Sequence, residues 1–280
     1  MKKKIAIIGA NGFLANNIHK RFDLKNTYYL LGKNNSDILC DYSKIDEIKK
    51  LISKYKFDFI INCVGYTKID NLEKEKELCF NLNVIIVHNI VQAIKESNIK
   101  PFLIHFSTDH LYNKKGNSTE ENYKIINYYA LSKYYSEFFA REVKSTILRT
   151  NFFGLSRHKT KKSFSDWVIN QLSNKKTINS FNDIYFNPLN FDTLVYLIEL
   201  IISKKITGVY NIGSNNGFSK DRFIKILCKH KSLDKKLIKT KNSTKFFKIP
   251  RPKDMRMNVK KFEKNYGIKL PNLIDEILKL

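Results

Sequence analysis

The sequence is short of acidic residues, of cysteine and of long apolar runs. Its 280 residues hold 51 Lys and Arg against 26 Asp and Glu, which leaves a formal net charge of +25. No apolar run approaches the roughly 20 residues that span a bilayer. The four cysteines have no CxxC spacing and stand in or beside apolar stretches, which argues against disulfides and against a zinc site. We therefore expect a cytoplasmic protein without a membrane span or a bound metal.

The excess of basic residues suggests nucleic-acid binding, but their pattern argues against it. Lysine far outnumbers arginine, whose planar fork is the usual reader of bases and phosphates. The lysines are scattered, and the longest clusters are pairs and triples such as Lys159, Lys161 and Lys162. We expect no nucleic-acid partner, although a positive field would attract anionic small molecules.

The first half of the chain alternates short apolar runs with longer segments of helical period, and no repeat or low-complexity linker interrupts it. This alternation is typical of βαβ units and a parallel sheet. The expected strands are Lys4–Gly9, Thr27–Leu31, Phe57–Val64, Phe102–Ser107, Thr146–Arg149 and Gly208–Ile212. The expected helices are Phe13–Phe22, Ile45–Tyr55, Glu75–Ser97, Asn127–Val143, Phe164–Leu172 and Phe191–Ile202.

After about Asn151 the alternation loosens, and the pattern favours a second, smaller body. We predict an α/β protein with a Rossmann-type doubly wound parallel sheet and a smaller C-terminal substrate-binding lobe. The sheet domain would comprise residues 1–155 with a returning segment at about 190–213. The lobe would comprise about 156–189 and 214–280.

A glycine-rich segment, Gly9-Ala10-Asn11-Gly12-Phe13-Leu14-Ala15, follows the first expected strand and opens a helix. This is the context of a dinucleotide-binding turn, although the spacing is GxxGxxA. Gly9 would allow the tight turn, and Gly12 would let the backbone approach a pyrophosphate at the helix N-terminus. A plain strand-to-helix turn remains the alternative.

Two further motifs carry hydroxyl and amine groups. Tyr129 and Lys133 form a YxxxK motif in an expected helix, so both side chains lie on one face. An ammonium beside a phenol lowers the pKa of the phenol, which suits a general acid. The segment from Ser107 to His110 ends a strand, where ligands of open α/β sheets bind. Chance pairing in the first case and a helix cap or turn in the second remain alternatives.

These motifs stand in one order with further matches along the whole chain, and together they identify a family. The matches include Cys40–Ser43, Asp58–Asp70, Asn83, Leu148–Gly154 and the tail from Arg251-Pro252 to Pro271. The sequence resembles the extended short-chain dehydrogenase/reductases, most closely their dTDP-4-dehydrorhamnose reductase branch. The resemblance implies NADPH-dependent reduction of a nucleotide-linked 4-keto-6-deoxy sugar, in nucleotide-sugar and cell-surface polysaccharide biosynthesis.

The resemblance also implies the residues of the site. The catalytic residues would be Thr108, Tyr129 and Lys133. The cofactor would contact Gly9, Asn11, Gly12, Phe13, Leu14, Lys33, Asp41, Tyr42, Cys63, Val64, Gly65, Asn83, Tyr129 and Lys133. The substrate would contact Thr108, Asp109, His110, Phe152, Arg251 and Arg256, where the two arginines suit a diphosphate; a structural role for them is the alternative.

Departures from the family pattern concern the sugar more than the hydride chemistry. Phe152 stands where the reductases usually have a tryptophan, His110 replaces a tyrosine, and Gly65 replaces an alanine. Dehydratases of the wider family carry Asp-Glu after the threonine, whereas this chain has Asp109-His110, so the elimination machinery is incomplete. An epimerase, with His110 as a proton donor, stays open. A non-catalytic role like that of the regulatory subunit of methionine adenosyltransferase conflicts with retention of all three catalytic residues.

The end of the second expected strand indicates the cofactor. NAD-specific sheets of this type usually place an acidic residue there. The segment Leu31–Asn34 has none, Lys33 is placed to meet a 2′-phosphate, and Asp37 comes several residues late. We expect NADPH, with NADH as the alternative, and we leave a homodimer open.

Overall fold

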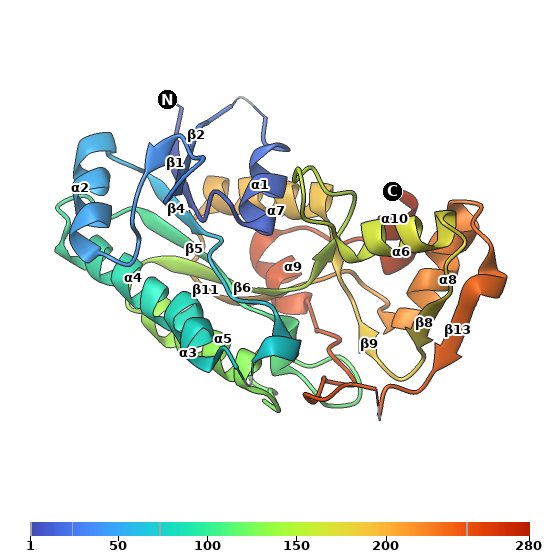
Figure 1. Cartoon of the computed structure of the whole chain (residues 1–280). Coiled ribbons are helices and arrows are strands. Elements are labelled where there is room, and N and C mark those ends of the chain that lie inside the picture. Colours follow the sequence, from blue (N-terminus) through green and yellow to red (C-terminus); the bar gives the residue numbers. More distant parts are fainter. Residues whose placement is uncertain (1, 24, 73, 245) are drawn as a thin grey trace. The chain divides into compact units, whose positions relative to one another are not determined.

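The structure is a computed structural model, and it describes residues 2–23, 25–72, 74–244 and 246–280 (Figure 1). The chain divides into two compact units. The first unit consists of Met1–Thr108, Tyr128–Arg149 and Leu197–Val209. The second consists of Asp109–Asn127, Thr150–Tyr196 and Tyr210–Leu280. Each unit is therefore assembled from segments that are far apart in the sequence.

A seven-stranded sheet has the spatial order β3-β2-β1-β4-β5-β6-β11. Its strands are β1 (Lys4–Ile8), β2 (Thr27–Gly32), β3 (Ile38–Leu39), β4 (Phe59–Asn62), β5 (Phe102–Phe106), β6 (Ser145–Thr150) and β11 (Gly208–Ile212). Neighbours from β3 to β6 pair in parallel. The order 3-2-1-4-5-6 is that of the doubly wound dinucleotide-binding sheets. The predicted fold class is confirmed.

The strands are continuous apolar runs because helices cover them. All of β5 is buried, and so are the four residues Ile5–Ile8 of β1. The first unit also holds α1 (Phe13–His19), α2 (Ile45–Tyr55), α4 (Ile86–Glu96) and α5 (Tyr128–Ala140). Helix α4 contacts both α2 and α5 (Figure 1). Its residues Val87 and Val91 join Ile60 of β4 and Leu103 of β5 in one buried cluster.

The expected helix Glu75–Ser97 is interrupted. It consists of α3 (Lys76–Phe80), a π-helical turn η2 (Asn81–Ile85) and α4. By length and composition alone, the stretch Lys76–Glu96 is the one candidate membrane span among the described residues. However, 56% of its most apolar window is buried inside the protein, and core helices of soluble proteins pass the same test.

The second unit is built from helices and three two-stranded pairs. The pairs are β7 (Phe152–Phe153) with β10 (Leu189–Asn190), β9 (Tyr185–Phe186) with β12 (Phe218–Ser219), and β8 (Ile178–Phe181) with β13 (Ile238–Lys241). The helices are α6 (Phe164–Ser173), α8 (Lys220–His230), α9 (Lys260–Tyr266) and α10 (Leu273–Leu278), while α7 (Phe191–Lys204) has residues in both units. Phe153, Phe186 and Phe223 belong to its buried core.

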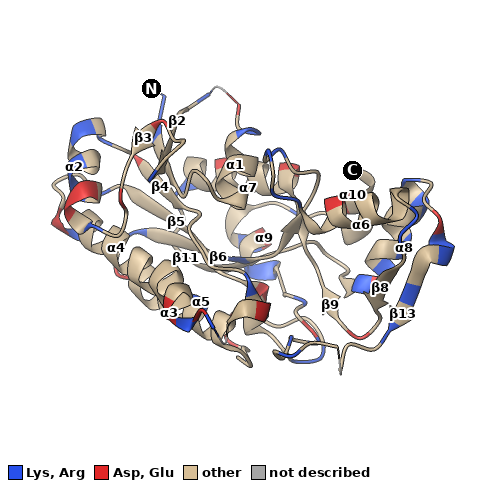
Figure 2. Ribbon diagram, viewed as in Figure 1, with Lys and Arg blue, Asp and Glu red and all other residues tan. Residues whose placement is uncertain are grey.

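Basic residues are spread over both units. Figure 2 shows Lys and Arg on α2 in the first unit and on α8 and β13 in the second, among other places. All four cysteines are free thiols, and Cys40, Cys79 and Cys228 are buried.

Candidate active site

The glycine-rich turn leaves no room for side chains at its two glycines. Gly9 adopts a φ of 101°, and a Cβ there would lie 3.2 Å from Val64. A Cβ on Gly12 would lie 2.8 Å from the Gly9 carbonyl oxygen. Gly12 also caps α1 without a side-chain hydrogen bond. Gly12 therefore supplies no side-chain cap, which is compatible with a phosphate at this end of the helix.

The predicted cofactor residues around the end of β2 contact one another. Asn11 donates to the Asn34 carbonyl oxygen at 2.8 Å. The Lys33 ammonium lies 2.9 Å from the Asp41 carboxylate and 6.0 Å from the centre of the Tyr42 ring. Hydrogen bonds from Ser43, and then Lys33, lower the pKa of Asp41 to about 2. Lys33, expected to meet a 2′-phosphate, thus already has an anionic neighbour.

The segment after β4 approaches α5 at Gly65. A Cβ at Gly65 would lie 3.3 Å from Asn83 Oδ1 and 3.8 Å from the Lys133 ammonium nitrogen. Burial raises the pKa of the neighbouring Cys63 thiol, which keeps it neutral. The glycine that replaces the family's alanine therefore leaves space directly beside Lys133.

Asn83 joins this segment to α5. Its Oδ1 accepts from the Tyr66 amide at 2.7 Å, and its Nδ2 donates to Ser132 Oγ at 2.8 Å and to the Tyr66 carbonyl oxygen at 3.3 Å. Asn83 lies in the π-helical turn η2, and such turns occur often at functional sites. The predicted asparagine is thus a buried connector between the β4 loop and the helix of Tyr129 and Lys133.

Tyr129 and Lys133 both lie in α5 and are nearly inaccessible, with 9% and 5% of their surface exposed. Burial lowers the pKa of Lys133 to about 8, against the opposing effect of Glu137 and of Cys63. The ammonium is therefore charged below about pH 8. Thr108, also in the first unit, is buried directly after β5.

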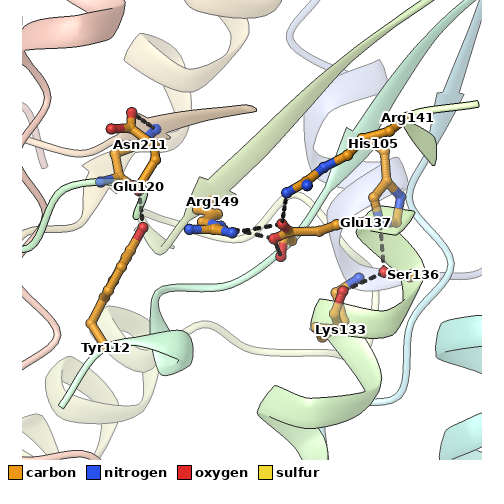
Figure 3. Close-up of polar contacts among 10 residues, drawn as sticks. His105, Tyr112, Glu120, Lys133, Ser136, Glu137, Arg141, Arg149 and Asn211 are labelled. Atoms are coloured by element: carbon orange, nitrogen blue, oxygen red, sulfur yellow. Dashed lines mark hydrogen bonds and ion pairs between the residues drawn. The ribbon is translucent and has the colours of Figure 1, made fainter. Parts of the chain in front are cut away.

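A buried ion pair fixes the elements that carry these residues (Figure 3). Arg149 of β6 donates to Glu137 of α5 through Nε at 2.9 Å and Nη2 at 2.7 Å. Ser107 Oγ donates to the same carboxylate at 2.6 Å, and Arg141 lies 3.3 Å from it. Glu137 stands one turn after Lys133, and Ser107 stands immediately before Thr108. One carboxylate therefore ties α5 to the ends of both β5 and β6.

A second buried network runs through His105 of β5. Its Nε2 lies 2.8 Å from Ser136 Oγ, and its Nδ1 lies 3.2 Å from Asn62 Nδ2. Ser136 in turn donates to the Lys133 carbonyl oxygen at 2.6 Å (Figure 3). Burial lowers the pKa of His105 well below its usual value, so it is neutral. Glu137, Arg149 and His105 were not predicted as site residues. The sequence signals were the Lys133-to-Glu137 spacing, which places both on one helix face, and the position of Arg149 in the family-like segment Leu148–Gly154.

The predicted substrate residues other than Thr108 lie in the second unit. Asp109 accepts from Asn151 Nδ2 at 2.8 Å. Burial, with Lys220 and Arg251 nearby, lowers the pKa of His110 to about 3, so His110 is neutral.

Phe152 and the two arginines have different surroundings. The Phe152 ring lies 5.3 Å from the Phe191 ring. Arg251 lies over Phe247 at 5.3 Å, whereas Arg256 donates to Asp254 through Nε at 2.9 Å and Nη2 at 2.6 Å. Asp254 thus already occupies the fork of Arg256.

The turn after β1, the strand order and the Tyr129–Lys133 pair in α5 define an extended short-chain dehydrogenase/reductase. Within this class, residues 3–279 match the family described as RmlD substrate binding domain, and the chain belongs to this family. The predicted recognition is confirmed.

Individual relatives are distant but extend over most of the chain. The probable low-salt glycan biosynthesis reductase Agl14 of Haloferax volcanii is 24% identical over 86% of this chain and 82% of its own. The dTDP-4-dehydrorhamnose reductase of Salmonella typhimurium is 23% identical over 82% of this chain and 81% of its own. The crystal structure of dTDP-4-dehydrorhamnose reductase from Bacillus anthracis in complex with NADP superposes with a TM-score of 0.89. It is 24% identical and covers 100% of this chain and 98% of its own.

Proposed function

We propose that the protein reduces the ketone of a nucleotide-linked 4-keto-6-deoxy sugar with NADPH, in sugar-nucleotide biosynthesis. The observation that carries the proposal is the buried Tyr129–Lys133 pair, with Lys133 beside Gly65. The family match extends over residues 3–279. The relatives named reductases, and the neighbour that binds NADP, support the same reaction and cofactor.

The first unit would bind the cofactor. Gly9 and Gly12, with Asn11, Phe13 and Leu14, would receive the pyrophosphate at the turn, where a Cβ on either glycine would crowd the backbone. Asp41, Tyr42 and Lys33 would lie at the adenosine end, and Cys63, Val64, Gly65 and Asn83 would line the path toward Lys133. The charge of Lys33 would favour the 2′-phosphate of NADPH. Because Asp41 already pairs with Lys33, the preference for NADPH over NADH should be modest.

Bound NADPH supplies the hydride. Tyr129 would give its proton to the ketone oxygen as negative charge develops there, and Thr108 would donate a hydrogen bond to the same oxygen. Lys133, charged below about pH 8, would favour the phenolate that Tyr129 becomes and would bind the ribose hydroxyls. The second unit would bind the nucleotide sugar through Asp109, His110, Phe152 and its basic residues. Four free thiols fit the reducing cytoplasm.

The test is a screen of keto-sugar nucleotides with NADPH, with products identified by mass spectrometry. A reductase yields a product two hydrogens heavier and consumes NADPH in equal amount. An epimerase yields an isomer without net consumption, and a non-catalytic protein yields neither; either outcome would overturn the proposal. The preference for NADPH over NADH is tested by measuring both dissociation constants by fluorescence titration. Equal dissociation constants would show that there is no preference.

A further inference from the structure

A cluster of charged residues in the second unit, which we call the Lys220 cluster, consists of Asp109, His110, Lys220 and Arg251. These residues are close enough to influence one another. Lys220 and Arg251 both lower the pKa of His110, and Asp109 and Arg251 act in opposite directions on Lys220. Lys220 was not among the predicted site residues, since nothing in the sequence separates it from the many other lysines.

The fold holds Lys220 at the start of α8. Its amide donates to the Ile184 carbonyl oxygen at 2.8 Å, and Ser219 before it caps the helix by accepting from the Arg222 amide. The Lys220 ammonium lies 5.6 Å from the centre of the Phe164 ring and 5.7 Å from that of Phe186. The lysine thus rests on an aromatic surface that belongs to the core of the unit.

Among the described residues, Lys220 differs from other basic residues of the unit in having no direct ion pair, although Asp109 acts on it as an opposite charge. Lys225 pairs with Asp221 at 2.7 Å, and Arg256 pairs with Asp254. Within the described part of the chain, Lys220 Nζ makes no hydrogen bond and no ion pair, while its surroundings desolvate it. Lys220 is only partly buried, so a ligand can reach it, and a partly desolvated cation without a direct ion pair favours an anionic ligand.

We propose that Lys220, together with Arg251, binds an anionic group of the nucleotide-sugar substrate next to His110. This inference rests on the proposed function and specifies the substrate contact. The group is an oxyanion, which the diphosphate or a carboxylate on the sugar would supply. A lysine acts there as a point charge and an arginine as a fork. Lys220 takes the role first given to Arg256, whose fork Asp254 occupies.

The experiment is calorimetric titration of the full chain with UDP-glucose, UDP-glucuronate, dTDP-glucose and inorganic pyrophosphate. Lys220→Met removes the charge and keeps an apolar stem on the two rings. We expect it to weaken nucleotide-sugar binding by about tenfold to hundredfold, the range of a charge-assisted hydrogen bond. Lys220→Arg should restore much of the affinity. Lys229→Met, at an exposed lysine in the last turn of the same helix, is the matched control and should change nothing.

The ligands separate the possible outcomes. An equal loss for UDP-glucose and UDP-glucuronate identifies the diphosphate, and a loss confined to UDP-glucuronate identifies the carboxylate. If Lys220→Met binds every ligand as the wild type does, the proposal is wrong. If the wild type binds no nucleotide sugar, the proposed function fails by itself. Pyrophosphate binding then tests the anion site at Lys220. If Lys220→Met binds pyrophosphate more weakly than the wild type, the anion site is supported. If both bind it equally, or neither binds it, the anion site is ruled out. NADPH affinity, unchanged in all variants, confirms that each is folded.

Discussion

Each unit holds a desolvated charge, fully buried in the first unit and partly exposed in the second, and the two charges have different surroundings. In the first unit Glu137 receives two hydrogen bonds from Arg149 and one from Ser107, so both members of the ion pair are satisfied. In the second unit the Lys220 ammonium lies over two phenylalanine rings. A satisfied buried charge fixes the relative position of the elements that carry it, whereas an unsatisfied one favours a ligand. The Glu137–Arg149 pair therefore has a structural role, whereas Lys220 is suited to binding a ligand.

The Glu137–Arg149 pair has a consequence for catalysis. It joins Glu137 of α5 to Arg149 of β6 and to Ser107 directly after β5, and Thr108 and Lys133 are close to these residues along the chain. A catalytic group must be held within about 0.5 Å of its productive position. We therefore regard Glu137 as a positioning residue for the site, acting through the strand end and the helix.

The largest effect should come from breaking the satisfied pair. Glu137→Ala leaves Arg149 buried without its partner, and we expect it to lower the free energy of unfolding by about 3–5 kcal/mol. Urea denaturation followed by circular dichroism measures this loss. The double variant Glu137→Met with Arg149→Leu should recover much of it, because both charges are then absent. A single-variant loss below about 1 kcal/mol would contradict the account.

Lys133 is intermediate between the Glu137–Arg149 pair and Lys220, because it is a buried cation with Glu137 nearby. Its pKa falls from the ordinary 10.5 to about 8 on folding, chiefly through burial. Between these values the unfolded chain binds more protons, so stability should rise with pH from about 8 to about 10.5, by about 3 kcal/mol from this residue. Comparison with Lys133→Met at pH 7 and pH 10 isolates the effect. The same dependence in both proteins would show that Lys133 does not cause it.

The smallest effect should come from Lys220. Lys220 makes no ion pair within the described residues, and its attraction to Asp109 and to the two rings is opposed by desolvation and by Arg251, so Lys220→Met should leave the melting temperature of the ligand-free protein unchanged or slightly raised. Differential scanning calorimetry measures it, with Lys229→Met as the reference. A clear drop in melting temperature would mean that Lys220 stabilises the unit, and the contrast between the two units would disappear.

The sequence predicted the sheet and most helices because their signals are local. Buried strands such as Phe102–Phe106 are continuous apolar runs, and Ile45–Tyr55 was located to the residue. Short strands such as β7, β9 and β12 were missed, because two residues carry no periodicity. The π-helical turn at Asn81–Ile85 was missed because its hydrophobic pattern continues that of α4.

The candidate site was predictable only where a motif marks it. The glycine turn and the Tyr129–Lys133 spacing were visible, since each is contiguous in the chain. Glu137 and Arg149 stand 12 positions apart in the chain, and the Lys220 cluster gathers residues more than 100 positions apart. Such contacts depend on tertiary packing, and no local pattern encodes them. The assigned roles of the site residues stay predictions.

The central claim is that Tyr129 is the general acid, and one substitution tests it most directly. Tyr129→Phe keeps the ring in α5 and removes only the hydroxyl, so kcat should fall by about 10²–10⁴ with little change in the dissociation constant for NADPH. Tyr128→Phe, the neighbouring half-buried tyrosine without a lysine four residues later, is the matched control and should stay active. If Tyr129→Phe keeps most of the wild-type kcat, or if Tyr128→Phe loses it, the assignment is wrong.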